Sequence, residues 1–251
     1  MKPCFAFTCN DPYVLLLAPL LRSMNKVHGG RFPYRIYVFC NDTLSRENRE
    51  KLKAIHDDIV FHDVDVSRYT DNGKMTIKYF SVECFALHNY GEERVIYTGA
   101  DCLCISPVDE LVKIDVDLGM PREKRRPEMF SNGVMTIGEK YLNDETYNAL
   151  LKADYSHVKM FGNDMKLYNC FFKDQIKEID WTYDVVNTEI EFLAAEGKTF
   201  DDIVFLHLIN KPIEGGCREK LGPKIHDLWR SYFVMDYPEA KERWRKEKEA
   251  R

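Results

Sequence analysis

Residues 94–110, RVIYTGADCLCISPVDE, form the stretch of sequence that decides the fold. The run Val95-Ile96-Tyr97 is apolar on both faces of a strand, which is typical of the centre of an α/β sheet. The chain then turns at Gly99-Ala100-Asp101, which places the Asp101 carboxylate where the strand ends. Open α/β sheets bind ligands beyond the carboxyl ends of their strands, so Asp101 lies at the expected ligand edge. There it can bind a divalent cation or simply cap the turn.

Upstream of this stretch, apolar strands alternate with helices. We expect strands at Cys4–Cys9, Tyr34–Cys40 and Ile59–Val64. We expect helices from Asp11 through Met24, near Arg46–His56 and over Ile77–Tyr90, the first with Asp11 as N-cap and Pro12 at its first position. This βαβαβαβ order predicts an α/β fold with a Rossmann-like, mostly parallel central sheet and flanking helices.

Downstream of Asp101 the alternation breaks. Strands are expected at Val116–Met120, Met129–Ile137 and Ile203–His207, and helices at Asp144–Ala153 and Asp164–Phe172. Beside the central sheet we expect a small second, antiparallel element, and the charged segment Tyr237–Arg251 predicts a C-terminal helical tail.

Composition limits the class of protein. With 251 residues and 45% hydrophobic content, the chain can bury one substantial core, which we place at residues 1–216 with a helical appendage at 217–251. A net charge of −5 gives no general attraction for nucleic acid, so we expect no nucleic-acid partner. The sequence shows neither a signal peptide nor eighteen consecutive apolar residues, which predicts a soluble, cytoplasmic protein. Eight cysteines without a CxxC pair indicate free, buried thiols.

Five segments, in this order, carry a family resemblance: FTCNDPYVLLLAPLLRSM at 7–24, YTGADCLCISPVDEL at 97–111, FSNGVM at 130–135, FGNDMKLYNCFF at 161–172 and FLHLINKPI at 205–213. They resemble the motifs of glycosyltransferase family 8, the family of glycogenin and the lipopolysaccharide galactosyltransferases. The resemblance implies a GT-A fold and transfer of a sugar from a UDP-sugar to a hydroxyl acceptor, such as a glycan. It further implies retention of the anomeric configuration and assistance by a divalent cation, Mn²⁺ or Mg²⁺.

The resemblance also implies roles for individual residues. Asp101 and His207 match the metal ligands, and Asp164 matches the catalytic carboxylate beside the anomeric carbon. The positions that match donor-binding residues are Phe7, Cys9, Asn10 and Tyr13 for uracil and ribose, Lys78 and Lys211 for the phosphates, Gly99, Ala100 and Asp101 at the D-x-D motif, and Ser131, Asn132 and Gly133 at the turn facing the sugar. For Phe7 and Cys9 ordinary packing is an equal alternative, as is a solvated helix end for Lys78. Asp164 can also act as a helix N-cap.

Departures from the family motifs leave alternatives open. Gly99 replaces the first aspartate of D-x-D, Met165 stands where the family has Gln, and Ile213 replaces a Trp in a shortened closing motif. These changes motivate two other functions, a nucleotide-sugar-binding protein without turnover and a metal-independent transferase. Whether Asp164 forms a glycosyl-enzyme or orients the sugar is also open.

Two surface features permit functional hypotheses. The basic loop, Arg122–Pro127, can border the acceptor groove and favour an anionic acceptor, or it can be an ordinary solvated loop. The C-terminal segment holds Leu228, Trp229, Tyr232 and Phe233, followed by Trp244 among charged residues; such a cluster can contact a membrane surface or pack onto the domain. The oligomeric state is open.

Overall fold

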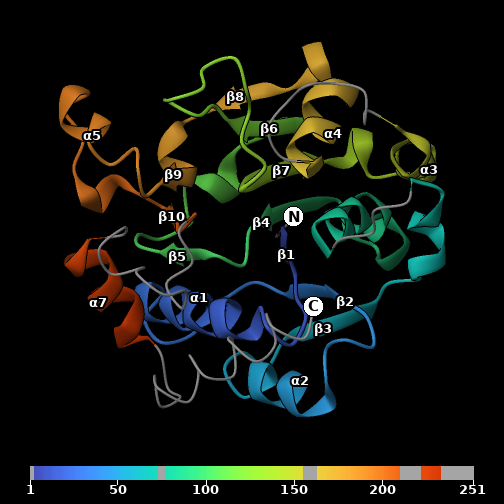
Figure 1. The fold of residues 1–251 in the computed structure, drawn as a ribbon, viewed down its shortest axis with the longest axis horizontal. Coiled ribbons are helices and arrows are strands. Elements are labelled where there is room, and N and C mark those ends of the chain that lie inside the picture. Colours follow the sequence, from blue (N-terminus) through green and yellow to red (C-terminus); the bar gives the residue numbers. More distant parts are fainter. Residues whose placement is uncertain (1–2, 73–76, 155–162, 210–221, 233–251) are drawn as a thin grey trace.

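A computed structural model describes residues 3–72, 77–154, 163–209 and 222–232 (Figure 1). Its strands are β1 Cys4–Thr8, β2 Ile36–Cys40, β3 Ile59–Asp63, β4 Arg94–Thr98, β5 Cys102–Cys104, β6 Leu118–Pro121, β7 Val134–Gly138, β8 Lys177–Ile179, β9 Val185–Val186 and β10 Phe205–His207. Its α-helices are α1 Val14–Val27, α2 Arg46–Lys53, α3 Asp144–Lys152, α4 Asn163–Phe171, α5 Phe192–Ala195 and α7 Pro223–Ser231. The 3₁₀ helices are η1 Val66–Asn72, η2 Ile77–Tyr90, η3 Leu111–Lys113, η4 Glu139–Tyr141, η5 Lys173–Gln175, η6 Trp181–Asp184 and η7 Phe200–Asp202.

In the described part of the chain, a seven-stranded central sheet has the order β3-β2-β1-β4-β7-β6-β8. The strands from β3 to β4 are parallel, and Phe5 on β1 lies opposite both Ile36 and Ile96. Strand β7 is antiparallel to β4 and to β6, and β8 is parallel to β6. The prediction of a mostly parallel α/β sheet is therefore confirmed. The carboxyl ends of β1 and β4 meet at one edge, where the candidate site lies.

A smaller sheet joins β5, β10 and β9 in that order. Strand β10 is antiparallel to β5 and parallel to β9, with His207 opposite Cys102 and Val186. The predicted small second element is therefore confirmed. It brings the residues after Asp101 next to a segment more than a hundred positions later in the sequence.

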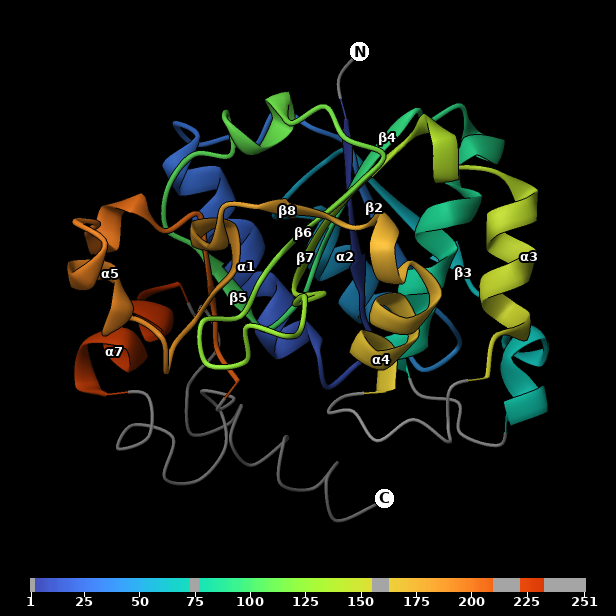
Figure 2. The ribbon, with the colours of Figure 1, turned by 90° about the horizontal axis from the view of Figure 1, so that it is seen from above.

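Apolar side chains alternate along β1 and divide the core between the two faces of the central sheet. Cys4 and Ala6 pack with η2, α3 and α4 on one face, and Phe5 and Phe7 pack with α1 and α2 on the other. Figure 2 shows the sheet between these layers, with α3 and α4 on one side and α1 on the other. Burial of both faces explains why the strands read as nearly continuous apolar runs.

The described part of the C-terminal segment packs onto the domain. Trp229 on α7 is buried in a cluster with Leu15 of α1 and Leu103 of β5. The Arg22 guanidinium donates a hydrogen bond to the Tyr232 carbonyl oxygen at 3.0 Å. Packing is therefore the role of Trp229, while residues 233–251 lie outside the described residues.

Two further observations concern membranes and cysteines. No helix among the described residues combines the length and the apolar character that a membrane span needs. The free thiols predicted from the sequence are confirmed at Cys4, Cys9, Cys40, Cys84, Cys102, Cys104 and Cys170, whereas Cys217 lies outside the described residues.

Some predicted boundaries are wrong. Helix α1 begins at Val14, because the Asn10 side chain accepts a hydrogen bond from the Tyr13 backbone N–H and the Asn10 carbonyl accepts one from Val14. Asp11, the predicted N-cap, instead accepts hydrogen bonds from Ser45 and Asn48 on and before α2.

The strand predicted from Met129 begins only at Val134, because residues 131–133 turn through the candidate site. The helix predicted over Ile77–Tyr90 has these bounds and is a 3₁₀ helix. All its residues from Phe80 to Leu87 are buried, so its sequence shows no amphipathic stripe.

Candidate active site

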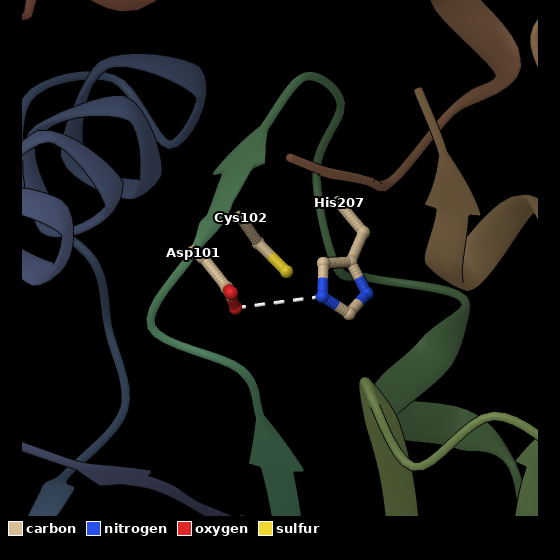
Figure 3. Close-up of side chains that lie close together, drawn as sticks. All are labelled: Asp101, Cys102 and His207. Atoms are coloured by element: carbon tan, nitrogen blue, oxygen red, sulfur yellow. Dashed lines mark ion pairs between the residues drawn. The ribbon is translucent and has the colours of Figure 1, made fainter. Parts of the chain in front are cut away.

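Asp101 and His207 come together at the junction of the two sheets. Asp101 lies in the turn between β4 and β5, and His207 ends β10. The Asp101 Oδ1 and His207 Nε2 atoms are 3.4 Å apart, and both side chains point into the same space (Figure 3). The backbone fixes this pairing, because the Leu208 N–H donates to the Asp101 carbonyl oxygen at 2.8 Å. The sequence prediction that these two residues share a site is therefore consistent with their positions.

A second carboxylate, from Asp184, holds the other side of the His207 ring. Asp184 ends η6, its side chain has no exposed surface, and its Oδ1 lies 3.2 Å from His207 Nδ1. A carboxylate only accepts, so the imidazole N–H donates in this contact. His207 is thus clamped between Asp101 and Asp184.

These carboxylates set the charge of His207 in the metal-free chain. Burial alone would lower the pKa of His207, but the negative charges of Asp184 and Asp101 and their hydrogen bonds outweigh burial. The pKa of His207 is therefore well above its ordinary value.

The turn Ser131-Asn132-Gly133 connects this array to the catalytic candidate Asp164. The Ser131 hydroxyl donates to Asp184 Oδ2 at 2.5 Å, and the Asn132 amide donates to Asp164 Oδ2 at 2.9 Å. Neighbouring side chains of one turn therefore hold two carboxylates that come from distant parts of the chain. We name these three residues the bridging turn.

Gly133 completes the bridging turn because no side chain fits there. A Cβ atom at this position would lie 2.2 Å from Asp184 Oδ2 and 2.6 Å from His207 Nδ1. The Gly133 carbonyl also accepts a hydrogen bond from the Gly99 N–H at 2.9 Å, which ties the turn to the end of β4. The close approach of Asp184 and His207 thus requires glycine.

Helix α4 positions Asp164 against the bridging turn. Asp164 lies in the first turn of α4, and Asn169 on the same helix exchanges two hydrogen bonds with the backbone of Phe130. Burial raises the pKa of Tyr97 on β4, and the charges of both Asp164 and Asp101 add to this effect. Tyr97 thus lies within electrostatic range of both carboxylates, at the carboxyl end of the central strand.

The predicted uracil-binding residues lie beside this edge with unequal exposure. Phe7 and Cys9 are fully buried in the core, which favours the packing interpretation of their side chains. The Asn10 side chain accepts a hydrogen bond from the Tyr13 N–H at the start of α1. Tyr13 is only partly buried, so it is the member of this group whose ring can reach a ligand. The role of the group in binding stays a prediction.

The predicted phosphate-binding lysines are not placed by the structure. Lys211 lies outside the described residues, and so does the side chain of Lys78. At the D-x-D position, Ala100 is buried, and a Cβ atom on Gly99 would lie 3.0 Å from Asp101 Oδ1. A carboxylate at position 99 would therefore crowd the Asp101 carboxylate.

The basic loop is docked on the segment that carries Asp184. Arg125 pairs with Glu191 and Lys124 pairs with Glu196, while the Arg125 backbone N–H donates to buried Glu189 at 2.8 Å. The remaining basic side chains also form ion pairs, Arg122 with Glu178 and Arg126 with Glu123. This pairing favours a structural role for the loop; its contact with an anionic acceptor stays a hypothesis.

Comparisons with known proteins identify the fold. No protein-family profile matches the sequence, and no curated protein sequence matches it. Among solved structures, the galactosyltransferase LgtC, in complex with donor and acceptor sugar analogs, is similar with a TM-score of 0.74 and 16% identity over 92% of this chain and 96% of that chain. The glycosyltransferase GlyE of Streptococcus pneumoniae TIGR4 is similar with a TM-score of 0.68 and 17% identity over 98% of this chain and 65% of that chain.

A third solved structure, the bifunctional glycosyltransferase WbbM, is similar with a TM-score of 0.72 and 16% identity. The match covers 96% of this chain and 51% of that chain. The chain therefore has the α/β fold of these glycosyltransferases, which confirms the predicted GT-A fold class. The identities are too low for the similarity to show more than the fold.

Sequence reasoning missed Asp184 and Cys102. Asp184 is the last residue of the short element η6, directly before β9, and no motif marks it. The structure brings it to His207 through the pairing of β9 with β10. Cys102 was counted among the buried thiols, yet its Sγ lies with the Asp101 and His207 donor atoms in one cluster, all within 4.8 Å of one another. The signal available in the sequence was its place directly after Asp101.

Proposed function

We propose that this protein is a glycosyltransferase that moves a sugar from a UDP-sugar donor to a hydroxyl acceptor, such as a glycan, with retention of configuration. The observation that supports this most strongly is the bridging turn. Its Ser131 donates to Asp184, which lies against the His207 ring, and its Asn132 donates to Asp164, so the turn links the Asp101–His207 pair to a separate carboxylate in a chain with a glycosyltransferase fold. A cation can neutralise the charge of a departing diphosphate, and a carboxylate can stabilise positive charge that develops on the sugar.

The donor atoms present fit a divalent cation. Asp101 supplies a carboxylate oxygen and His207 an imidazole nitrogen, and their separation of 3.4 Å is in the range of two ligands on one ion. Asp184 orients the ring from its other nitrogen, as carboxylates commonly do for metal-bound histidines. When bound, Mn²⁺ or Mg²⁺ would neutralise charge on the departing diphosphate.

Asp164 is the residue proposed to act at the sugar. Its Oδ2 accepts from the Asn132 amide, so the carboxylate has a defined direction before any ligand binds. A negative charge held beside the anomeric carbon stabilises positive charge that develops there during transfer. Because Met165 cannot hydrogen-bond as a Gln would, we favour a role in which Asp164 and Asn132 orient the sugar while the acceptor attacks from the side of the leaving group.

Gly99 supports one competing function. The lost carboxylate leaves Asp101 as the acidic ligand of the D-x-D position, which fits a protein that binds nucleotide-sugars without turnover. A metal-independent transferase is the remaining alternative, with a basic side chain in place of the cation.

Turnover and binding distinguish these functions. We expect calorimetry to detect UDP binding that requires Mn²⁺ and is lost in EDTA, and we expect release of UDP from a UDP-sugar under the same conditions. Asp101→Asn should abolish Mn²⁺-dependent UDP binding. Asp164→Asn should retain that binding and lower kcat by at least about a hundredfold, a loss of roughly 2.7 kcal/mol.

A matched control is Asp57→Asn, a charge loss at an exposed surface ion pair with Arg31. It should change neither property. UDP binding without turnover on any UDP-sugar would support the binding protein, turnover that survives EDTA would support the metal-independent enzyme, and no UDP binding would overturn the proposal.

A further inference from the structure

The Cys102 sulfur lies close to the atoms of Asp101 and His207 that would bind a cation. The Cys102 Sγ, an Asp101 carboxylate oxygen and a His207 ring nitrogen all lie within 4.8 Å of one another. Figure 3 shows the three side chains directed toward a common space. The arrangement follows from strand pairing, since Cys102 is the residue directly opposite His207.

We propose that this site binds a borderline-soft divalent cation of the Zn²⁺ class, with Cys102 as a protein ligand beside Asp101 and His207. The inference rests on the proposed function in so far as that function already uses Asp101 and His207 for a cation. It adds a third ligand and a metal preference.

The chemistry of the donor set carries the preference. Sites built from carboxylates alone suit Mg²⁺ and Mn²⁺, whereas thiolate and imidazole ligands favour Zn²⁺ and Co²⁺. Here Gly99 removes a carboxylate, and Cys102 brings a sulfur to the same site. Three protein ligands with one position left for an oxygen of a ligand is the arrangement of open zinc sites.

The surroundings of His207 indicate a site built to hold a metal. Buried Asp184 accepts from the ring at Nδ1, which leaves Nε2 facing Asp101 and the space beside Cys102. Ser131 in turn donates to Asp184, so the orienting carboxylate is itself fixed. Such outer hydrogen bonds direct a histidine toward its metal and raise its affinity for it.

Cation binding at Cys102 requires loss of the thiol proton. Burial raises the pKa of the Cys102 thiol, and the charges of Asp184 and Asp101 add to this effect. A cation coordinated by sulfur displaces that proton. The S–H bond and the His207 Nε2–H bond break, bonds from the sulfur and from Nε2 to the metal form, both protons leave to solvent, and no oxidation or reduction occurs.

Co²⁺ is the probe for this proposal, because a thiolate bound to Co²⁺ gives a charge-transfer absorption band in the near ultraviolet. Titration of the full chain with Co²⁺ should produce this band, and added Zn²⁺ should abolish it by displacement. Cys102→Ser and Cys102→Ala should both lack the band. Both should bind Zn²⁺ at least about tenfold more weakly.

Cys104→Ser is the matched control. Cys104 is a second buried thiol on β5; its Sγ donates to the Ser106 carbonyl oxygen and is not among the donor atoms clustered with Asp101 and His207. This variant should keep the band. Mn²⁺ binding, measured by electron paramagnetic resonance, shows whether each variant keeps a folded site, because Asp101 and His207 remain in all of them.

The outcomes separate this inference from the proposed function. Mn²⁺ binding without a Co²⁺ charge-transfer band would overturn the role of Cys102 and leave the glycosyltransferase proposal intact. The same band in both Cys102 variants as in the unaltered chain would also overturn it. Absence of binding for Mn²⁺, Co²⁺ and Zn²⁺ alike would overturn both this inference and the metal-assisted form of the proposed function, whereas UDP release in EDTA would still support a transferase.

Discussion

Asp184 joins the His207 ring to the bridging turn. Substitution of its carboxylate therefore tests whether this link supports cation binding at the site. We predict that Asp184→Asn weakens Mn²⁺ binding by about 10- to 100-fold, because the amide keeps the shape of the side chain and loses the charge that orients His207. Electron paramagnetic resonance of free Mn²⁺ measures this. Ser131→Ala, which removes the donor to Asp184 and the acceptor of the Gly133 N–H but keeps the Asp184 charge, should have a smaller effect. Equal affinity in Asp184→Asn and the unaltered chain would contradict the role of Asp184.

Gly133 gives a second prediction at the scale of the residue. In Gly133→Ala, the new methyl group would overlap Asp184 and His207, so these side chains must move apart. We expect a loss of Mn²⁺ binding and a fall of about 1–3 kcal/mol in the free energy of unfolding, measured by urea denaturation. Gly197→Ala is the control, since open space surrounds that position and only its positive φ of 67° opposes a side chain. A Gly133→Ala protein that binds Mn²⁺ normally would show that the close packing there is not required.

Among the elements, η2 is held against its neighbours by buried Glu83. This carboxylate accepts hydrogen bonds from Tyr69 at 2.6 Å, Tyr147 at 2.8 Å and His62 at 3.2 Å. Burial alone would raise the pKa of Glu83, but these hydrogen bonds outweigh it and lower the pKa below its ordinary value of 4.5. The folded chain therefore prefers the ionised form more strongly than the unfolded chain does.

The sign of the pH dependence follows from this shift. A lowered carboxyl pKa contributes stability above its unfolded value and loses it as the pH falls through the folded value. Below pH 4.5 we expect the free energy of unfolding to fall, and Glu83→Gln should remove part of that fall while destabilising the protein at neutral pH by about 2 kcal/mol. Urea unfolding across this pH range measures both effects. Glu47→Gln, at an exposed position on α2, should match the unaltered chain; an unchanged pH profile in Glu83→Gln would contradict the argument.

At the scale of the whole molecule, α7 and the small sheet share one core. Trp229 packs with Leu15 and Leu103, which belong to α1 and β5. We predict that Trp229→Ala lowers the free energy of unfolding by about 3 kcal/mol or more, because a large cavity opens in that core. Chemical denaturation should still show one transition. Ile209→Ala, at a half-exposed position, should cost far less. A Trp229→Ala protein with unchanged stability would show that α7 is not part of this core.

Much of the fold follows from local patterns that the sequence displays. The apolar run at Val95–Tyr97 and its counterparts in β1, β2 and β3 predict a parallel sheet covered on both faces, because nothing polar interrupts them. Turn residues mark where most helices and strands stop. The short strands β5, β8 and β9 escape prediction, since two or three residues carry no measurable periodicity.

The candidate site likewise has features that the local sequence predicts and features that it does not. The sequence by itself determined the sheet and the carboxyl edge at which Asp101 lies, because alternation and strand ends are properties of neighbouring residues. Only the tertiary structure decided that Asp184 clamps His207, that Asn132 holds Asp164 and that Cys102 faces the same space. These contacts join segments up to about a hundred positions apart: the contacts of His207 depend on how β5, β9 and β10 pair, and that of Asp164 depends on how α4 packs against the bridging turn, which no local pattern encodes.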